Sequence, residues 1–303
     1  MLELLPNRSA TRYFRGNLHG HSIHSDGALP AEQVVTRYRE LGYDFTCLSD
    51  HLWMEPIFCA QTVLDTAELD TPDFVTIPSA EIHCLGKAFD NDNLWHIVAN
   101  GLPLDFACAD EQETAPELVS RAIAAGAFVT IAHPEWYTLT TEEAATVGHA
   151  HGVEIYNHSS HIECMRGGGT ATLDYLLQEG RRMMITATDD SHFRIDDGGG
   201  GWVMVAAENL SAPALVDALK SGAYYSSSGA DFEAIWLDGD VLEIRCSPVS
   251  HICVSGSQTK TMSRNGENLT AARFDLANFK SDWFRVTLCN RAGQMAWSNP
   301  HWR

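Results

Sequence analysis

GNLHGHSIHSDG, residues 16–27, joins an apolar segment to a cluster of polar side chains. The segment begins within an apolar run, Tyr13–Leu18, which is predicted to be a β-strand. The run leads directly into His19 and His21, and Asp26 follows after a short polar turn. Imidazoles and carboxylates gathered in this way are candidate ligands for a transition metal. Taken alone, H-x-H is a weak signal, because alternate residues of a strand share a face and can simply be two exposed imidazoles.

An apolar strand followed by His, Asp or Glu recurs through the first two thirds of the chain. Most of the expected strands are four to six residues long and apolar throughout, which is typical of strands covered on both faces. They are Tyr13–Leu18, Phe45–Ser49, Phe74–Pro78, Trp95–Ala99, Phe128–Ile131, Val153–Tyr156 and Met183–Thr188. Helical segments are predicted between them, at 30–41, 116–125 and 171–177. Alternating strands and helices indicate a parallel sheet with right-handed crossovers.

The number of these units predicts the fold class. Seven strands in about 190 residues favour a closed barrel over two doubly wound halves. We therefore expect an α/β fold, a closed seven-stranded (β/α)7 TIM-like barrel, over residues 1–228. From 229 to 303 the pattern changes to short alternating strands with turn signals such as Asp238-Gly239, which predicts a small C-terminal antiparallel β domain resembling a sandwich.

The candidate ligands gather at the carboxyl ends of the predicted strands. In a parallel barrel these ends meet on one face, where active sites are built. The candidates are His19, His21, Asp26, His51, Glu81, His96, His133, Asp190 and His192. A lone His at a strand end is more often a hydrogen-bonded structural residue than a ligand. Because six strand ends each supply His, Asp or Glu, the joint pattern predicts a multinuclear metal site.

Five of these segments also resemble the motifs of the PHP (polymerase and histidinol phosphatase) family. Residues 16–27 resemble its first motif, H-x-H followed by S-D-G, and the other four occur in family order: CLSDH (47–51), SAEIH (79–83), IAHP (131–134) and TDDSH (188–192). The tail, with AWSNP at 296–300, resembles the β extension of a stand-alone branch of PHP-type hydrolases, some of which cleave carbamate or carboxyl esters.

The resemblance implies a distorted seven-stranded barrel with two or three divalent transition metals, Mn, Fe or Zn, and assigns their ligands by position. The first metal would be held by His19, His21, Glu81 and Asp190, the second by Glu81, His96 and His133, and the third by Asp26, His51 and His192. Glu81 and Asp190 would act in catalysis as bridges, since one carboxylate can span two cations. Asp50 is a candidate proton donor to the leaving group.

Three positions leave alternatives open. His83 competes with His96 for the second metal, and His96 is preferred because its slot follows a strand. Asp189 adjoins Asp190, and the S-D-x-H register selects Asp190. The family often has Asp two residues before the first His, whereas this chain has Asn17, which is expected to weaken the orientation of a ligand.

The predicted function is that of a metal-dependent phosphoesterase, which hydrolyses small phosphate mono- or diesters with a hydroxide that bridges the metals. Candidate substrate contacts are Arg166, Arg194, Asn157 and His158. The alternative is a carboxyl or carbamate ester hydrolase that uses the same metal site. A third interpretation is a metal-binding or regulatory module without catalysis.

The amino-acid composition limits the classes of binding partner that the protein can have. The chain has 303 residues and a net charge of −20, from 20 Lys+Arg and 40 Asp+Glu, which argues against long nucleic acids and anionic membranes. Neither a secretory signal nor an apolar run of about 18 residues is evident. The eight cysteines form no C-x-x-C pair, which indicates free thiols in a reducing compartment. We expect a cytoplasmic protein with a small anionic ester substrate, and the sequence leaves the oligomeric state open.

Overall fold

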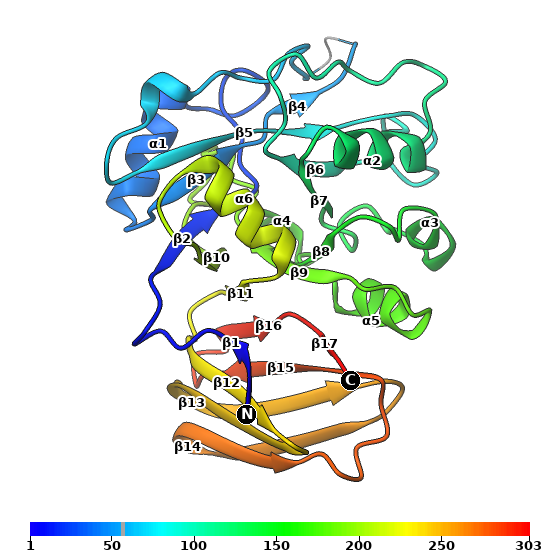
Figure 1. Cartoon of the computed structure of the whole chain (residues 1–303). Helices are drawn as coiled ribbons and strands as arrows, with labels where there is room; N and C mark the ends of the chain where they lie inside the picture. Colours follow the sequence, from blue (N-terminus) through cyan, green and yellow to red (C-terminus); the bar gives the residue numbers. More distant parts are fainter. Residues whose placement is uncertain (56–57) are drawn as a thin grey trace.

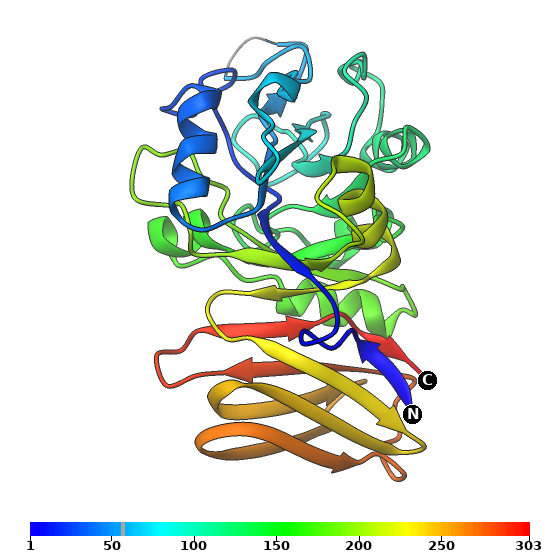
Figure 2. The ribbon, with the colours of Figure 1, turned by 60° about the vertical axis from the view of Figure 1, so that its left-hand side comes forward.

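The computed structural model describes residues 1–55 and 58–303, which form a mixed α/β unit stacked on an all-β unit (Figure 1). The α/β unit extends from Tyr13 to Ser227 and carries the helices of the described chain. The β unit consists of residues 232–302 together with the first strand of the chain. Figure 2 shows the same two layers after a turn of 60°, with both termini in the β unit.

Two sets of parallel strands form the sheet of the α/β unit. The first set is β2 (Tyr13–Asn17), β3 (Phe45–Leu48), β4 (His51–Leu52) and β5 (Val75–Ile82); the second is β7 (Phe128–Ile131), β8 (Gly152–Asn157) and β9 (Met184–Thr188). These strands are rich in apolar residues buried on both faces, as the sequence predicts. Six of the seven strand positions expected from the sequence correspond to β2, β3, β5, β7, β8 and β9, and the seventh corresponds to β6 (Ile97–Asn100). The short strand β4 is not among the expected strands.

Among the seven expected strands, one runs against the predicted parallel direction. β6 (Ile97–Asn100) joins the two sets and is antiparallel to both β5 and β7. The chain between β5 and β6 contains no helix and returns as a hairpin, in which Leu85 and Leu94 form an antiparallel bridge. A strand that returns without a crossover must run antiparallel to its predecessor. The expectation of uninterrupted parallel crossovers is thus wrong at β6.

Main-chain contacts beyond the strands bring the first and last parallel strands together. Gly20 and Ser191 form a parallel bridge, and His21 N donates to Ser191 O at 2.8 Å. Asp190 N donates to His19 O, also at 2.8 Å. Because these contacts follow the ends of β2 and β9, they place the two motif segments next to each other. On its other side β2 pairs with β10 (Trp202–Ala206), which pairs with β11 (Tyr224–Ser227).

Helices cover the outside of this sheet. The longer ones are α1 (Ala31–Glu40), α2 (Ala115–Ala124), α5 (Thr170–Gln178) and α6 (Ala212–Ser221), and the shorter ones are η1 (Ala67–Leu69), α3 (Thr141–Thr146) and α4 (His158–Cys164). The start of α2 is fixed by a capping box between Thr114 and Glu117. None of the helices in the described part of the chain is long and apolar enough to cross a membrane.

The β unit is an antiparallel array. Its strands are β1 (Leu2–Leu5), β12 (Phe232–Asp238), β13 (Val241–Gly256), β14 (Thr261–Asp275), β15 (Trp283–Cys289), β16 (Met295–Ser298) and β17 (His301–Trp302). β1 pairs with β12, so the N-terminal strand lies in the β unit, although residues 1–228 are predicted to form the barrel. The domain division at residue 228 stays a prediction.

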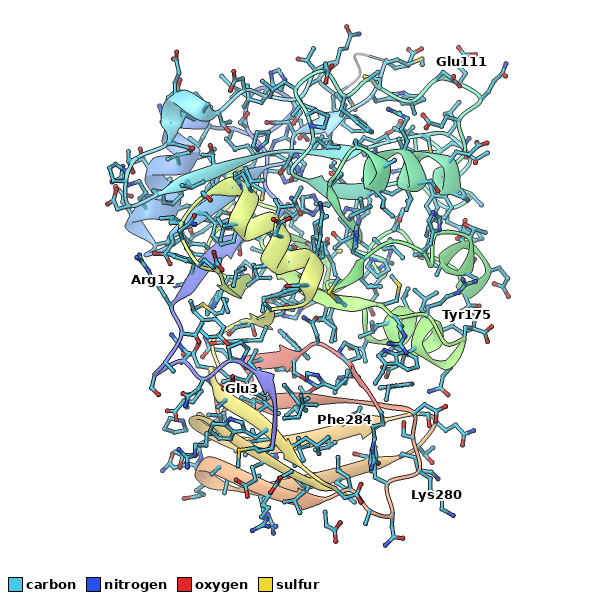
Figure 3. All side chains as sticks on the ribbon, viewed as in Figure 1. Glu3, Arg12, Glu111, Tyr175, Lys280 and Phe284 are labelled. Atoms are coloured by element: carbon cyan, nitrogen blue, oxygen red, sulfur yellow. The ribbon has the colours of Figure 1, made fainter. Side chains whose placement is uncertain are left out.

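The two units are joined by strand pairing and side-chain contacts as well as by the covalent chain. β11 pairs with β16, and the Trp297 ring stacks on Tyr156 with centroids 6.0 Å apart. The buried Asn299 accepts from Ile185 N at 2.9 Å and donates to the carbonyl of Tyr224 at 3.1 Å. Figure 3 shows side chains filling the junction between the units. The β unit therefore packs against β8 and β9 and stabilises them.

Candidate metal centre

Glu81, near the end of β5, lies at the middle of a histidine cluster. Its side chain has no exposed surface. Five imidazole nitrogens lie close to its carboxylate: Nδ1 of His96 at 2.7 Å, Nδ1 of His51 at 2.8 Å, Nε2 of His133 at 3.1 Å, Nε2 of His19 at 3.3 Å and Nε2 of His21 at 3.6 Å. These histidines come from four separate parts of the sheet, so the fold gathers the ligands that the strand ends predict.

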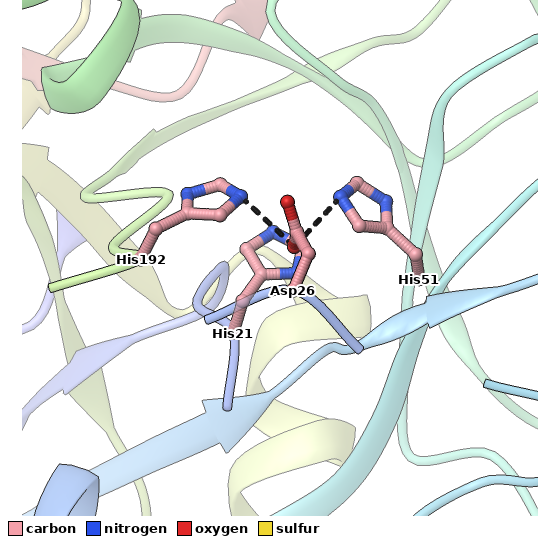
Figure 4. A group of neighbouring side chains, drawn as sticks. All are labelled: His21, Asp26, His51 and His192. Atoms are coloured by element: carbon pink, nitrogen blue, oxygen red, sulfur yellow. Dashed lines mark ion pairs between the residues drawn. The ribbon is translucent and has the colours of Figure 1, made fainter. Parts of the chain in front are cut away.

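Three groups of side chains bring possible ligand atoms within 4.8 Å of one another. They are His19, His21, Glu81 and Asp190; His51, Glu81, His83 and His96; and His21, Asp26, His51 and His192. The last group is drawn in Figure 4, where the Asp26 carboxylate lies between two imidazoles, 3.5 Å from His51 Nε2 and 3.4 Å from His192 Nε2. The first group has the same members as the first metal site implied by the resemblance.

Several atoms in these groups are buried without a hydrogen-bond partner. His19 Nε2, Glu81 Oε2 and Asp26 Oδ1 are all of this kind. An unpaired buried polar atom costs about 1–3 kcal/mol, so such atoms are rare unless something satisfies them. Imidazoles and carboxylates pointing at a common centre are the ligands that divalent transition metals take. The residues present therefore fit divalent metal ions.

A cavity of about 310 Å³ opens onto the cluster. Glu81, His96, His133 and Asp190 are among its lining residues, whereas His19 and His21 are fully buried and do not line it. Its other lining residues are Phe58, Asp90, Asn91, Asp92, Trp136, Ser159, Ser160, Glu163 and Arg194, besides Asp26, His51 and His192 at the edge of the cluster. The cavity gives a small molecule access to the candidate ligands.

Charges in the metal-free cluster are strongly coupled. Burial and the neighbouring His192 and His51 lower the pKa of His21 to about 3. Burial also opposes protonation of His96, but Glu81 and Asp90 outweigh it and raise the pKa of His96 to about 9. In the same way, burial is outweighed by Asp26 and Asp190, which raise the pKa of His192 to about 9. Metal-free protein thus holds protons at neutral pH on histidines that would have to release them to bind a cation.

These shifts predict that the unfolding free energy of the metal-free protein falls between about pH 6.5 and pH 9. The folded-state pKa values of His96 and His192 exceed the ordinary value of 6.5, so the folded state binds protons more tightly than the unfolded state. The resulting stabilisation is complete below pH 6.5 and is lost as the pH rises through 9. Urea denaturation of chelator-treated protein at several pH values measures this slope.

The control for this measurement is the double variant His96→Gln, His192→Gln. It removes these two titrating groups and should reduce the slope in this pH range, while His19, whose pKa is also raised, is left in place. A stability that stays constant or rises from pH 6.5 to 9 in the unmodified protein would contradict the charge coupling described above.

Comparisons with known proteins place this architecture. No protein-family model matches the chain, and no curated protein matches its sequence. A solved structure from Bacteroides vulgatus ATCC 8482, a two-domain protein containing a predicted PHP-like metal-dependent phosphoesterase, superposes with a TM-score of 0.53 at 17% identity, over 95% of this chain and 93% of that one. This chain has the PHP-like fold.

Two further solved structures are more distant. One is a candidate metal-dependent phosphoesterase from Bifidobacterium adolescentis ATCC 15703, with a TM-score of 0.42 and 16% identity over 68% of this chain and 94% of that one. The other is an amidohydrolase from Chromobacterium violaceum with bound sulfate and no metal, with a TM-score of 0.42 and 15% identity over 61% of this chain and 89% of that one.

Within the PHP-like fold, the structure separates the neighbouring pairs of candidates. Asp190 has a positive φ of 54° and faces the cluster, with Oδ1 2.9 Å from His21 Nε2. Asp189 instead accepts from three backbone amides of the glycine run, Gly199 to Gly201, at 2.7–2.8 Å. The structure thus gives Asp189 a role in holding a loop, and leaves Asp190 beside the predicted ligands.

His83 and His96 also differ in their surroundings. Both nitrogens of His83 have partners: Nε2 lies 2.8 Å from His51 Nδ1, and Nδ1 donates to Trp95 O at 2.7 Å. His96 lines the cavity. This arrangement favours His96 as the ligand and His83 as a support for the His51 ring, although the ligand assignment itself remains a prediction.

Asp50 lies outside the cavity lining. Its Oδ1 accepts from the backbone amides of Ser22 and Ser25 at 2.8 and 3.1 Å, and the hydroxyls of both serines donate to the same carboxylate. These four hydrogen bonds fix the turn that leads to Asp26. Its placement favours a structural role over the predicted proton donation.

Of the four candidate substrate contacts, Arg194 lines the cavity. Its guanidinium contacts the main-chain oxygen and the carboxylate of Asp26. The other three candidates are absent from the lining. Asn157 is fully buried and caps α4 by accepting from Ser160 N at 3.0 Å, His158 contacts the Tyr156 hydroxyl, and the main-chain amide of Arg166 donates to Ser160 O. Their substrate contacts stay predictions.

Sequence reasoning missed several residues of the cavity and its support. Trp136 lies three positions after His133, and its ring packs 5.0 Å from that imidazole. Glu154 is fully buried in the middle of β8. A single charged residue inside an otherwise apolar buried strand is a signal that could have found Glu154, because such a charge must be paired.

Proposed function

We propose that this protein is a metal-dependent hydrolase of small phosphate mono- or diesters. The observation that carries the proposal is the fully buried Glu81 carboxylate, which is surrounded by five imidazoles and lines an open cavity. The PHP-like fold and the phosphoesterase named for the Bacteroides structure support it. When bound, two or three divalent cations, Mn, Fe or Zn, would activate a water molecule and polarise an oxygen of the substrate.

The residues of this chain have separate tasks in the proposal. Glu81 and Asp190 would hold cations together with the histidines, and Arg194 at the cavity wall would contact an anionic group of the substrate. A cavity of about 310 Å³ suits a small molecule. The proposal therefore includes a small anionic ester as partner, no long nucleic acid and no membrane.

The fold and location are part of the same proposal. We propose that β2, β3, β5, β6, β7, β8 and β9 form a distorted seven-stranded barrel, which the bridge between Gly20 and Ser191 closes. The β unit would then be its C-terminal domain. The free state of all eight cysteines supports a cytoplasmic location.

One observation favours a second candidate function, hydrolysis of carboxyl or carbamate esters. Among the described residues that line the cavity, Arg194 is the single Lys or Arg, and its guanidinium is already paired with the Asp26 carboxylate. Asp90, Asp92 and Glu163 line the same cavity. Such walls accept a neutral acyl ester at least as readily as a doubly charged phosphate monoester.

Hydrolysis of matched p-nitrophenyl esters tests the proposal. Mn-supplemented protein is expected to cleave p-nitrophenyl phosphate or bis-p-nitrophenyl phosphate faster than p-nitrophenyl acetate, and His19→Ala should lower the rate by about 10³-fold because it removes a ligand to the activating cation. Release of p-nitrophenolate, followed by its absorbance, measures all three reactions.

The possible results distinguish the phosphoesterase from the two other interpretations. Cleavage of the acetate alone would replace the phosphoesterase by the acyl ester hydrolase. If the protein binds metal but hydrolyses none of the three esters, a metal-binding or regulatory module without catalysis would be favoured. Full activity in His19→Ala would contradict the assignment of the site itself.

A further inference from the structure

We infer that Glu154 is the positioning residue that sets the geometry of the metal centre, an inference that rests on the proposed function. Glu154 lies in the middle of β8, and its carboxylate has no exposed surface. Both oxygens are fully used. Oε1 lies 2.8 Å from His19 Nδ1 and accepts from Thr188 Oγ1 at 2.7 Å, and Oε2 accepts from His133 N at 2.8 Å and from Asn157 Nδ2 at 3.0 Å.

The contact with His19 determines which ring nitrogen is available to a cation. A carboxylate only accepts hydrogen bonds, so the proton of the neutral imidazole is held on Nδ1. The other nitrogen, Nε2, then presents its lone pair to the cluster, where it lies 3.3 Å from Glu81 and 3.1 Å from Asp190. Buried Nε2 has no hydrogen-bond partner of its own. Glu154 thus orients the ring and selects the tautomer that a metal requires.

The same carboxylate reaches two further predicted ligands. His133 has a φ of 20°, which is rare for a residue with a side chain, and its amide is held by Glu154. Asn157 Nδ2 donates both to Glu154 and to Asp190 Oδ2, each at 3.0 Å. One buried carboxylate therefore connects His19, His133 and Asp190, which follow three different strands.

The described neighbourhood offers no substitute for this carboxylate. Asn17, two residues before His19, donates to the main-chain oxygen of His19 at 2.6 Å and makes no hydrogen bond with the imidazole ring. Glu81 and Asp190 lie on the Nε2 side of the ring. The orientation of His19 in the structure therefore depends on Glu154.

Glu154→Gln tests the inference with a side chain of the same size. The side-chain nitrogen of glutamine cannot accept a hydrogen bond. In one orientation of the amide it faces His19 Nδ1 and Thr188 Oγ1, and in the other it faces His133 N and Asn157 Nδ2. Turned toward His19, it would force the imidazole proton onto Nε2, which blocks the lone pair. We expect the affinity for Mn²⁺, measured by calorimetry on chelator-treated protein, to fall about 10- to 100-fold. Unchanged affinity and stoichiometry would overturn the inference.

Thr186→Val is the matched control. Thr186 is buried in β9 opposite Glu154 in the strand register, and its hydroxyl has no hydrogen-bond partner, so valine replaces it without loss of a contact. Its Mn²⁺ affinity should equal that of the unmodified protein. Because a merely structural role of Glu154 would lower the melting temperature without changing the affinity of the folded fraction, melting of the metal-free variants is recorded alongside.

A second measurement needs no variant that might fail to fold. In zinc-loaded protein labelled with ¹⁵N-histidine, the His19 ring, assigned by comparison with His19→Gln, should carry its proton on Nδ1. A proton on Nε2 would overturn the inference, as would a failure of the unmodified protein to bind any divalent cation. Ester hydrolysis is measured separately. If His19, oriented by Glu154, binds metal but the protein cleaves no ester, only the proposed function is refuted.

Discussion

Replacement of Glu81 by glutamine is expected to lower kcat/KM for the best p-nitrophenyl ester by about 10³-fold or more, or about 4 kcal/mol of transition-state stabilisation. The carboxylate of Glu81 lies within 3.6 Å of five imidazole nitrogens, and one of its oxygens is buried without a partner. An amide carries no charge to offset a cation and spans two cations poorly. Bound manganese per chain should fall in parallel.

Metal content after dialysis, measured by elemental analysis, and the rate of ester cleavage together check this prediction. Glu111→Gln is the control, since Glu111 carries the same side chain in an exposed loop (Figure 3) and does not line the cavity. Glu81→Gln protein that keeps both its metal and its activity would show that the buried carboxylate is not part of the centre.

A chain that ends at residue 228 is expected to be insoluble or to unfold without cooperativity. The cut removes β16, which pairs with β11, and it removes Trp283 and Trp297, which share an apolar cluster with β7, β8 and β9. It also removes Asn299, which hydrogen-bonds the main chain of Ile185 and Tyr224. Large apolar side chains of the α/β unit would then face water.

Solubility, circular dichroism and thermal unfolding of the truncated chain measure this effect. Asn299→Ala in the full chain isolates the polar part of the junction, and it should cost about 2–4 kcal/mol because buried main-chain groups lose their partners. A soluble 1–228 fragment with a sharp unfolding transition and bound cations would mean that the two units fold independently.

The sequence located the ligand-bearing strand ends because the relevant signals are local. Short apolar runs identify buried strands, and the side chain that follows each run is read directly, as for His133 after β7 or Asp190 after β9. The apolar runs also predicted the positions of β2 and β3 to within a residue. They did not predict that β13 runs unbroken for 16 residues where short strands were expected, since hydrophobic alternation weakens at Ser247 and Pro248.

By itself, the sequence determined which residues are available for metal chemistry and in what order they follow the strands, because both depend on neighbours along the chain. The tertiary structure decided the antiparallel direction of β6, the turn-holding contacts of Asp50 and the pairing of Glu154 with His19 across 135 positions. Such pairings depend on which strands lie side by side and on how far each side chain reaches. Periodicity records which face of a strand is buried, but it does not record which distant partner lies there.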